Sequence, residues 1–277
     1  MLPNLIIIGA PKAGTTALHQ YLGHHPEIFM SRQKELQLFQ RDDWRDQLAW
    51  YESQFPPCNA LVRGEGSPVY TLYPFCRDVP CRMRELVPDA KLIYLVRDPV
   101  ERFIAHYVEH YSLGFETRPF ADVAADLRPG NQVLAGSRYA TQLEKYLECF
   151  PRSQILVVDQ DEMRARRRET LSRVFGFLGV DSGFWSPEFE ALHNQRKQVR
   201  YNGFARWLYR HGLFDSAQRA GRGAPAPLRR AARRTLGPTI SRPVLDGKLR
   251  EGVVADLAGE AERFRALTGC RFESWSV

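Results

Sequence analysis

The sequence has few cysteines, and none of them are spaced as a metal-binding or redox pair. There are five in the chain, and no CxxC pair occurs among Cys58, Cys76, Cys81, Cys149 and Cys270. Free thiols are the default for cysteines this scattered, although a Cys76–Cys81 bridge is possible. The cysteines therefore give no reason to expect a fold that depends on disulfides.

The sequence also lacks a long hydrophobic run and a recognisable leader. No apolar stretch is long enough to span a bilayer. The first strand-like segment begins within a few residues of Met1, which leaves no room for a charged region and a cleavage site. For a chain that starts here, we expect a cytoplasmic protein without stable membrane insertion.

Length and charge set further bounds. With 277 residues, 44% of them hydrophobic, the chain can form one large α/β domain with a sizeable core. The formal net charge of +7 suits a polyanionic ligand, and it is equally compatible with nucleic acid or a membrane surface.

The chain opens with a strand, a small-residue loop and a helix start. Residues 5–8 are an apolar run typical of a buried strand, residues 9–16 are rich in small side chains, and a helical pattern follows. Such a loop directs backbone N–H groups at an anion, and the helix dipole favours negative charge there. The segment predicts a phosphate-binding loop.

This loop lacks the lysine of nucleotide hydrolases. The Walker pattern is G-x-x-x-x-G-K-[ST], and here Thr15 follows Gly14 where the lysine belongs. The lysine lies inside the loop, at Lys12, from which it can reach an oxygen on the 5′ side of a nucleotide. The pattern disfavours a P-loop kinase or nucleotide hydrolase, which stays the first alternative, and an unrelated phosphate site also stays open.

A second candidate anion site follows residues 92–96, a short apolar run typical of a strand in a parallel sheet. Arg97 stands at its carboxyl end, the edge at which ligands bind in open α/β sheets. Pro99 is favoured at a helix start, and the predicted helix carries Arg102, Ala105 and Tyr107.

Together the two motifs resemble those of sulfotransferases that use 3′-phosphoadenosine 5′-phosphosulfate (PAPS). Residues 9–16 are similar to the family's 5′-phosphosulfate loop, and residues 97–107 to its 3′-phosphate motif R-x-P-x-x-R-x-x-S-x-Y, with Ala105 in place of the serine. The resemblance implies a P-loop-type α/β fold with a central parallel sheet flanked by helices. It implies PAPS as the donor and 3′-phosphoadenosine 5′-phosphate (PAP) as the product. The missing hydroxyl at Ala105 predicts a weaker grip on the 3′-phosphate or a substitute donor group nearby.

The resemblance also assigns the donor-binding residues. These are Lys12, Ala13, Gly14, Thr15, Thr16, Arg97, Ala105, Tyr139 and Arg200. Lys12 is the candidate cation at the leaving oxygen. Relatives place a tyrosine near the nucleotide, as at Tyr139, and a late basic loop over the donor, as at Arg200. A plain solvated cluster is the alternative for residues 196–200.

Two segments resemble the acceptor side of the family. Residues 34–39 match K-E-x-[HQ]-x-F of the heparan-type branch, in which the glutamate deprotonates the acceptor, so Glu35 is the expected base and Gln37 orients the acceptor. Residues 64–70 resemble G-E-x-[ST]-P-x-Y, so Ser67 and Tyr70 are expected to line the acceptor cleft. The alternative is a turn serine and a core aromatic. Gly66 stands where some glycan-acting relatives carry lysine, which disfavours a highly sulfated polysaccharide.

The full prediction is a single domain over residues 1–277 with a basic, loop-rich insertion at about 195–243. Its expected activity is sulfuryl transfer to a hydroxyl, less readily an amine, of a small molecule, glycan or lipid. No metal and no nucleic acid are expected as partners, and the oligomeric state is not predicted. A non-catalytic nucleotide-binding module is the second alternative, motivated by Ala105.

One short pattern points to a different chemistry. His106, Glu109 and His110 match the zinc-protease pattern H-x-x-E-H. The predicted helix after Arg97 already accounts for this segment, so we interpret the match as chance. His106 is the reserve candidate for the general base.

Overall fold

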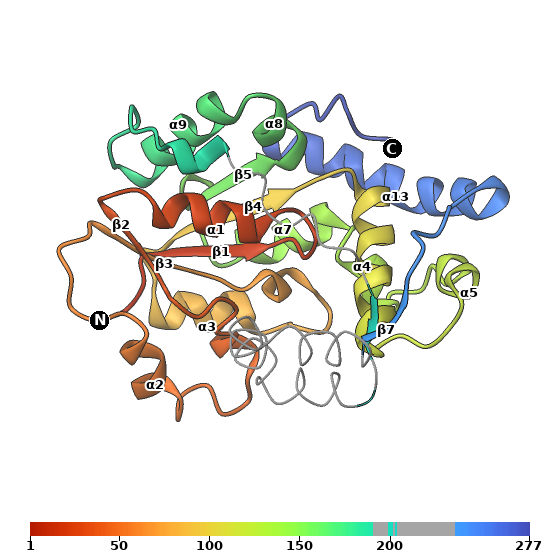
Figure 1. The fold of residues 1–277 in the computed structure, drawn as a ribbon, viewed down its shortest axis with the longest axis horizontal. Helices are drawn as coiled ribbons and strands as arrows, with labels where there is room; N and C mark the ends of the chain where they lie inside the picture. Colours follow the sequence, from red (N-terminus) through yellow and green to blue (C-terminus); the bar gives the residue numbers. More distant parts are fainter. Residues whose placement is uncertain (191–198, 202, 204–235) are drawn as a thin grey trace, which may run out of the picture.

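The computed structural model describes residues 1–190, 199–201, 203 and 236–277 (Figure 1). In these residues a central sheet of five parallel strands has the order β2-β3-β1-β4-β5. The strands are β1 (Leu5–Gly9), β2 (Ile28–Met30), β3 (Val62–Gly66), β4 (Lys91–Val96) and β5 (Ile155–Asp159). The expected α/β fold with a central parallel sheet is confirmed.

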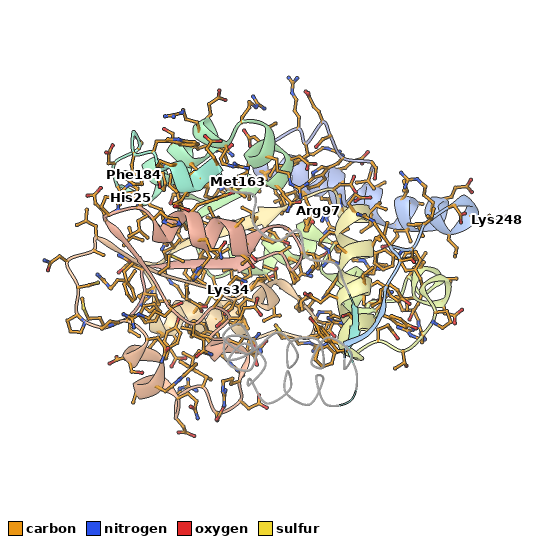
Figure 2. All side chains as sticks on the ribbon, in the orientation of Figure 1. His25, Lys34, Arg97, Met163, Phe184 and Lys248 are labelled. Carbon is orange, nitrogen blue, oxygen red and sulfur yellow. The ribbon has the colours of Figure 1, made fainter. Side chains whose placement is uncertain are left out.

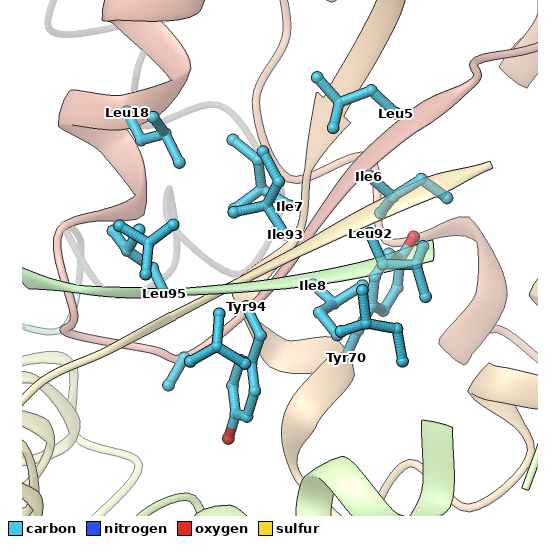
Figure 3. Packing of buried hydrophobic residues seen from close by; sticks show 14 of the residues in the cluster. Leu5, Ile6, Ile7, Ile8, Leu18, Tyr70, Leu92, Ile93, Tyr94 and Leu95 are labelled. Atoms are coloured by element: carbon cyan, nitrogen blue, oxygen red, sulfur yellow. The ribbon is translucent and has the colours of Figure 1, made fainter. Parts of the chain in front are cut away.

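The strands β1 and β4 consist almost entirely of apolar residues because both faces of the sheet are covered. All of Leu5–Ile8 and Leu92–Val96 are fully buried. Successive side chains alternate between the faces. In Figure 3, Leu18 of the first helix lies on the same side as Ile7 and Ile93, and Tyr70 lies on the other side with Ile8. Continuous hydrophobic runs are therefore required here rather than an alternating pattern.

Helices and short 3₁₀ turns connect the strands and cover the sheet (Figure 1). The α-helices of the region up to residue 190 are α1 (Thr15–Gly23), α2 (Leu48–Ser53), α3 (Val79–Leu86), α4 (Pro99–Leu113), α5 (Phe120–Ala125), α6 (Gln132–Ala135), α7 (Tyr139–Leu147), α8 (Gln160–Ala165) and α9 (Arg167–Leu178). The 3₁₀ turns are η1 (Leu38–Gln40), η2 (Pro68–Thr71), η3 (Arg152–Gln154) and η4 (Pro187–Glu190).

The helix α4 starts where the sequence predicts. Asp98 caps it, because its side chain accepts a hydrogen bond of 2.7 Å from the backbone N–H of Glu101. Pro99 occupies the first helical position, where its missing N–H costs nothing. This start fixes Arg97 between the end of β4 and the first turn of α4.

The predicted insertion at 195–243 lies mostly outside the described residues. Its described parts contain a two-stranded antiparallel sheet of β6 (Val199–Tyr201) and β7 (Leu236–Thr239), and β6 lies against α4. The described parts of the predicted loop-rich insertion therefore include two short strands. The single-domain boundary stays a prediction.

The long C-terminal helix α13 (Gly247–Thr268) packs against α5 and α7. Its Phe264 stacks on Trp275, and both rings contact Tyr139 at the start of α7. The C-terminal segment thereby buries Tyr139, whose hydroxyl contacts the backbone carbonyl of Arg97. No helix in the described ranges is long and apolar enough to cross a bilayer.

Candidate active site

A cleft of about 940 Å³ lies at the carboxyl edge of the sheet. Every strand of the sheet is followed by residues that line it: Lys12 after β1, Lys34 after β2, Pro68 after β3, Arg97 after β4 and Gln160 after β5. Figure 2 labels Lys34, Arg97 and Met163, three lining residues from segments far apart in the sequence. Parallel strands bring these loops together because their carboxyl ends share one edge.

The predicted phosphate loop forms one end of the cleft. Gly14 precedes α1 in the left-handed region, with φ of 95°. This backbone conformation favours glycine, and a Cβ added to Gly14 would also lie 2.7 Å from Gln160 Nε2, so the amide of Gln160 would have to move. Thr15 and Thr16 line the cleft at the helix N-terminus, whereas Ala13 is fully buried behind them. The arrangement is that of an anion cradle.

Lys12 points toward α4 and makes an ion pair. Its Nζ lies 2.8 Å from Glu109 Oε1, and the two side chains are 24% and 35% exposed. Both residues line the cleft. Sequence reasoning included Glu109 only in the H-x-x-E-H pattern and missed this contact, which joins residues 97 positions apart.

Arg97 enters the cleft from the end of β4. Its Nη1 donates to the backbone carbonyl of Lys12 at 3.3 Å, and its Nη2 lies 3.3 Å from Glu101 Oε2. Glu101 is also paired with Arg242, which lines the same cleft. The guanidinium therefore lies directly beside the phosphate loop, as the two motifs predict.

Tyr139 holds the backbone of Arg97 in place. Its hydroxyl donates to the carbonyl of Arg97 at 2.9 Å, and its ring is buried against Phe264 and Trp275. It is absent from the described cleft lining. Its observed contact is with the arginine's backbone, so direct nucleotide contact, as expected from the resemblance, stays a prediction.

Arg102, the second arginine of the motif at residues 97–107, does not line the described cleft. Arg102 is fully buried; it donates to Ser137 Oγ at 2.7 Å and to the carbonyl of Val133, and its Nη1 lies 3.1 Å from His106 Nδ1. Burial lowers the pKa of Arg102 to about 10. This side chain joins α4 to α6, whereas Ala105 on the same helix lines the cleft.

The predicted base lies on a backbone held in an unusual conformation. Glu35 and Gln37 have φ of 64° and 55°, and both line the cleft. The N–H of Glu35 donates to the carbonyl of Gly66 at 3.0 Å, and the N–H of Gln37 donates to Ser67 Oγ at 3.1 Å. Lys34 Nζ lies 2.7 Å from Glu35 Oε1. These contacts fix the loop that carries the carboxylate.

Ser67 and Tyr70 lie beneath that loop and are absent from the described cleft lining. Both donate to the buried carboxylate of Glu65, at 2.7 Å from Ser67 Oγ and 3.1 Å from Tyr70 OH, and Tyr51 OH donates at 3.3 Å. Burial raises the pKa of Glu65 to about 7. The alternative interpretation of a turn serine and a core aromatic fits these positions better than direct acceptor contact.

Besides Arg242, sequence reasoning missed two further cations of the cleft. Arg164 of α8 and Arg167 of α9 both line it. Arg167 also donates to the carbonyl of Phe189 at 2.6 Å and lies over the ring of Tyr21. Nothing in their local sequence distinguishes them from the other arginines of these helices. The side chain of Arg200 lies outside the described part of the structure, so its predicted role is not tested.

The H-x-x-E-H segment is packed as part of α4. The rings of His106 and His110 are in contact, with centroids 4.2 Å apart, and burial lowers the pKa of both. Glu109 is paired with Lys12. Among the described residues no group of three or more histidine, cysteine or acidic side chains is arranged to hold a metal ion.

A comparison with known protein families decides the family to which the chain belongs. The model of the sulfotransferase domain matches residues 2–203, which is most of the chain. The chain belongs to this sulfotransferase family. It is therefore an enzyme, and the resemblance to the family is confirmed, whereas the roles of the individual residues in the phosphate loop and the arginine motif stay predictions.

Curated relatives of the sulfotransferase come from the heparan branch. Heparan sulfate glucosamine 3-O-sulfotransferase 3B1 of Mus musculus is 33% identical over 65% of this chain and 46% of its own length. The bifunctional heparan sulfate N-deacetylase/N-sulfotransferase 1 of Caenorhabditis briggsae is 28% identical over 68% of this chain and 23% of its own length. The chain thus spans about a quarter to about half of these relatives.

A solved structure supports the fold. A sulfotransferase from Alicyclobacillus acidocaldarius superimposes over 100% of both chains with a TM-score of 0.69 and 22% sequence identity. At this identity the similarity concerns the arrangement of the sheet and helices. It agrees with the central parallel sheet described above.

Proposed function

We propose that this sulfotransferase moves a sulfuryl group from PAPS to an acceptor hydroxyl. The observation that carries the proposal is that Lys12 and Arg97 share one cleft with Glu35. The cleft also contains the basic side chains of Arg164 and Arg167. A polyanionic donor suits this excess of positive charge.

The residues present fit the donor on two observations. With Gly14 in the left-handed region, the loop brings the N-terminus of α1 to the cleft, where Thr15 and Thr16 line it, and such helix N-termini suit phosphate groups. Gln160 Oε1 is buried without a hydrogen-bond partner among the described residues, and Gln160 lines the cleft. A ligand that donates an N–H or O–H there would satisfy this oxygen.

Each residue then has a chemical task. Lys12 leaves Glu109 and stabilises negative charge that develops on the leaving oxygen. Thr15, Thr16 and the first amides of α1 hold the 5′ side of the donor, and Arg97 holds the 3′-phosphate. Glu35 accepts the proton of the attacking hydroxyl, and Gln37 orients it. Sulfuryl transfer resembles phosphoryl transfer, which has a loose transition state. Positioning and charge stabilisation therefore supply most of the rate acceleration.

The acceptor end of the cleft supports an uncharged acceptor. The helix α4 runs for about 20 Å from Pro99 to Leu113 at 1.5 Å per residue. Lys12 contacts it at Glu109, so Leu113 and Phe115 lie beyond the reacting centre, away from Arg97. We therefore propose that the acceptor hydroxyl belongs to an uncharged molecule, which is a small molecule, a lipid or a neutral glycan.

Charge at this end distinguishes the proposal from a heparan-type acceptor. The lining residues of η1 and η2, and the residue that follows η2, are neutral: Gln40, Pro68, Val69 and Leu72. Among the described lining residues on this side the cation is Lys34, which is already paired with Glu35. A heavily sulfated chain requires several free cations, so it suits this end of the cleft poorly.

The donor assignment is tested by calorimetric titration with PAP and with adenosine 5′-phosphate, both without Mg²⁺. PAP should bind at least about tenfold more tightly, because the 3′-phosphate forms charge-assisted hydrogen bonds. An Arg97→Ala variant should lose most of that preference, and Arg152→Ala, on η3, serves as the matched control. Equal binding of the two nucleotides, or Mg²⁺-dependent turnover of ATP, would overturn the assignment and favour a P-loop kinase or hydrolase.

A further inference from the structure

Two cysteines that are far apart in the sequence meet at the surface of the molecule. Cys81 lies in the first turn of α3, and Cys149 follows the last residues of α7. Their Sγ atoms are 3.2 Å apart, although 68 positions separate them in the chain. Cys81 is exposed and Cys149 is half-buried. Cys76, the partner considered for Cys81 from the sequence, has its Sγ 3.9 Å from Gln40 Oε1 instead.

We propose that Cys81 and Cys149 form an intramolecular disulfide by exchange with a low-molecular-weight disulfide such as oxidised glutathione. Both are free thiols in the structure. A disulfide bond is about 2.05 Å long, so the sulfurs need to approach by about 1 Å. Cys81 is exposed on the short helix α3, and a small rotation of its side chain provides this movement.

The different surroundings of the two thiols determine the order of events. Exposed Cys81 meets the external disulfide first, and its thiolate attacks one sulfur to give a mixed disulfide and one small thiolate. Burial and the contact with Cys81 raise the pKa of Cys149 to about 12, which makes it the slower nucleophile. Cys149 then loses its proton to solvent and attacks the sulfur of Cys81, releasing the second small thiol. The two protein thiols are oxidised by two electrons, and the small disulfide is reduced to two thiols.

The disulfide would join α3 and α7. Each of these helices donates a hydrogen bond to one of the two acceptor-side segments, residues 34–39 and residues 64–70. Next to Cys81, Arg82 Nη1 donates to the carbonyl of Phe39 at 3.0 Å and to that of Arg41 at 2.7 Å. On α7, Tyr146 OH donates to the carbonyl of Tyr70 at 3.0 Å. Closing this long loop restricts the unfolded chain, so the oxidised protein should melt on the order of 5 °C higher than the reduced protein.

The test equilibrates the purified full chain in a buffer of reduced and oxidised glutathione and then alkylates the remaining thiols. Mass spectrometry of non-reduced digests should show one linked pair of peptides, which contain Cys81 and Cys149. Cys58, Cys76 and Cys270 should be alkylated. The link and the rise in melting temperature should be absent in Cys81→Ser and in Cys149→Ser, and both should persist in the matched control Cys58→Ser.

Three results would overturn the proposal. One is full alkylation of both Cys81 and Cys149 under conditions in which the glutathione pool is mostly oxidised. Another is a link between Cys81 and Cys76. A third is a mixed disulfide at Cys81 that never resolves. Because the readout is a covalent bond and a melting temperature, it does not depend on the donor or the acceptor of the enzyme.

Discussion

The buried carboxyl group of Glu65 should make the stability of the protein depend on pH in a specific way. Burial raises its pKa to about 7 in the folded state. Three hydroxyl groups, those of Tyr51, Ser67 and Tyr70, donate to it and oppose the shift. An unfolded glutamate titrates at about 4.3. The difference of about 2.7 pKa units corresponds to about 4 kcal/mol, since each tenfold change in an equilibrium constant is about 1.4 kcal/mol.

The direction follows from proton binding. Between pH of about 4.3 and about 7, the folded protein keeps the proton on Glu65 and the unfolded chain has released it. The unfolded state therefore binds fewer protons, so the free energy of unfolding falls as pH rises through this window. Above pH of about 7 the full amount is lost. Glu65→Gln removes the titrating group, so the variant should lack this part of the fall.

The assay is urea unfolding of the wild-type protein and of Glu65→Gln at several pH values from about 4 to 8. The amide presents only one acceptor oxygen to three hydroxyl groups, so the variant should be less stable at low pH. Its stability relative to wild type should then improve by up to about 4 kcal/mol toward pH 8. Other titrating groups, such as Asp159 with its pKa raised to about 6, largely cancel in the difference.

A matched control separates this effect from a general effect of losing a carboxylate. Glu85 is exposed and paired with Arg45, so Glu85→Gln should show a nearly constant difference from wild type. A difference between Glu65→Gln and wild type that stays constant from pH 4 to pH 8 would refute the reasoning, because Glu65 would then titrate normally.

Three further predictions concern the proposed chemistry. Lys12→Ala should lower turnover by about 10²–10³, as loss of one charge-stabilising contact typically does, while the affinity for PAP measured by calorimetry falls much less; unchanged turnover would remove Lys12 from the mechanism. Ala105→Ser should tighten PAP binding by about tenfold or more, because a hydroxyl–phosphate hydrogen bond contributes about 1.5–3 kcal/mol; equal affinity in calorimetry would mean that another group already serves as the donor. Glu35→Gln should reduce turnover by about 10²–10⁴ and leave PAP affinity intact; near-normal turnover in this variant, with loss of turnover in His106→Ala, would transfer the role of base to His106.

Local patterns in the sequence predict the frame of the site well. The apolar runs before Lys12 and Arg97 indicate buried parallel strands, and the carboxyl ends of such strands meet at one edge. The sequence alone could therefore place Lys12 of the phosphate loop and Arg97 of the arginine motif at the same edge of the sheet. The structure brings Arg97 to the carbonyl of Lys12.

The direction of individual side chains could not be predicted in the same way. A motif match to residues 64–70 does not say whether Ser67 and Tyr70 face the cleft or the core, and the buried carboxylate of Glu65 draws both inward. Tyr139 is drawn inward by the aromatic cluster of the C-terminal segment, which lies more than a hundred residues away. Long-range packing decides these orientations, and no local pattern encodes it.

Contacts between charged side chains, and between cysteines, could not be predicted from the sequence for a related reason. The contacts Lys12–Glu109 and Cys81–Cys149 join residues 97 and 68 positions apart. Each partner is unremarkable in its own segment, since exposed charges and scattered cysteines are common. Only the folded topology shows that these side chains meet.

The most direct test of the central claim is transfer from labelled PAPS to a panel of acceptors, with products detected by mass. The panel should contain neutral alcohols, phenols, lipid alcohols, neutral glycans and heparan sulfate, and PAP release should be measured in parallel. We expect a product heavier by one sulfuryl group on an uncharged hydroxyl acceptor, stoichiometric PAP release, and loss of both in Glu35→Gln. Binding of PAP without transfer to any member of the panel would contradict the claim and favour a non-catalytic nucleotide-binding module.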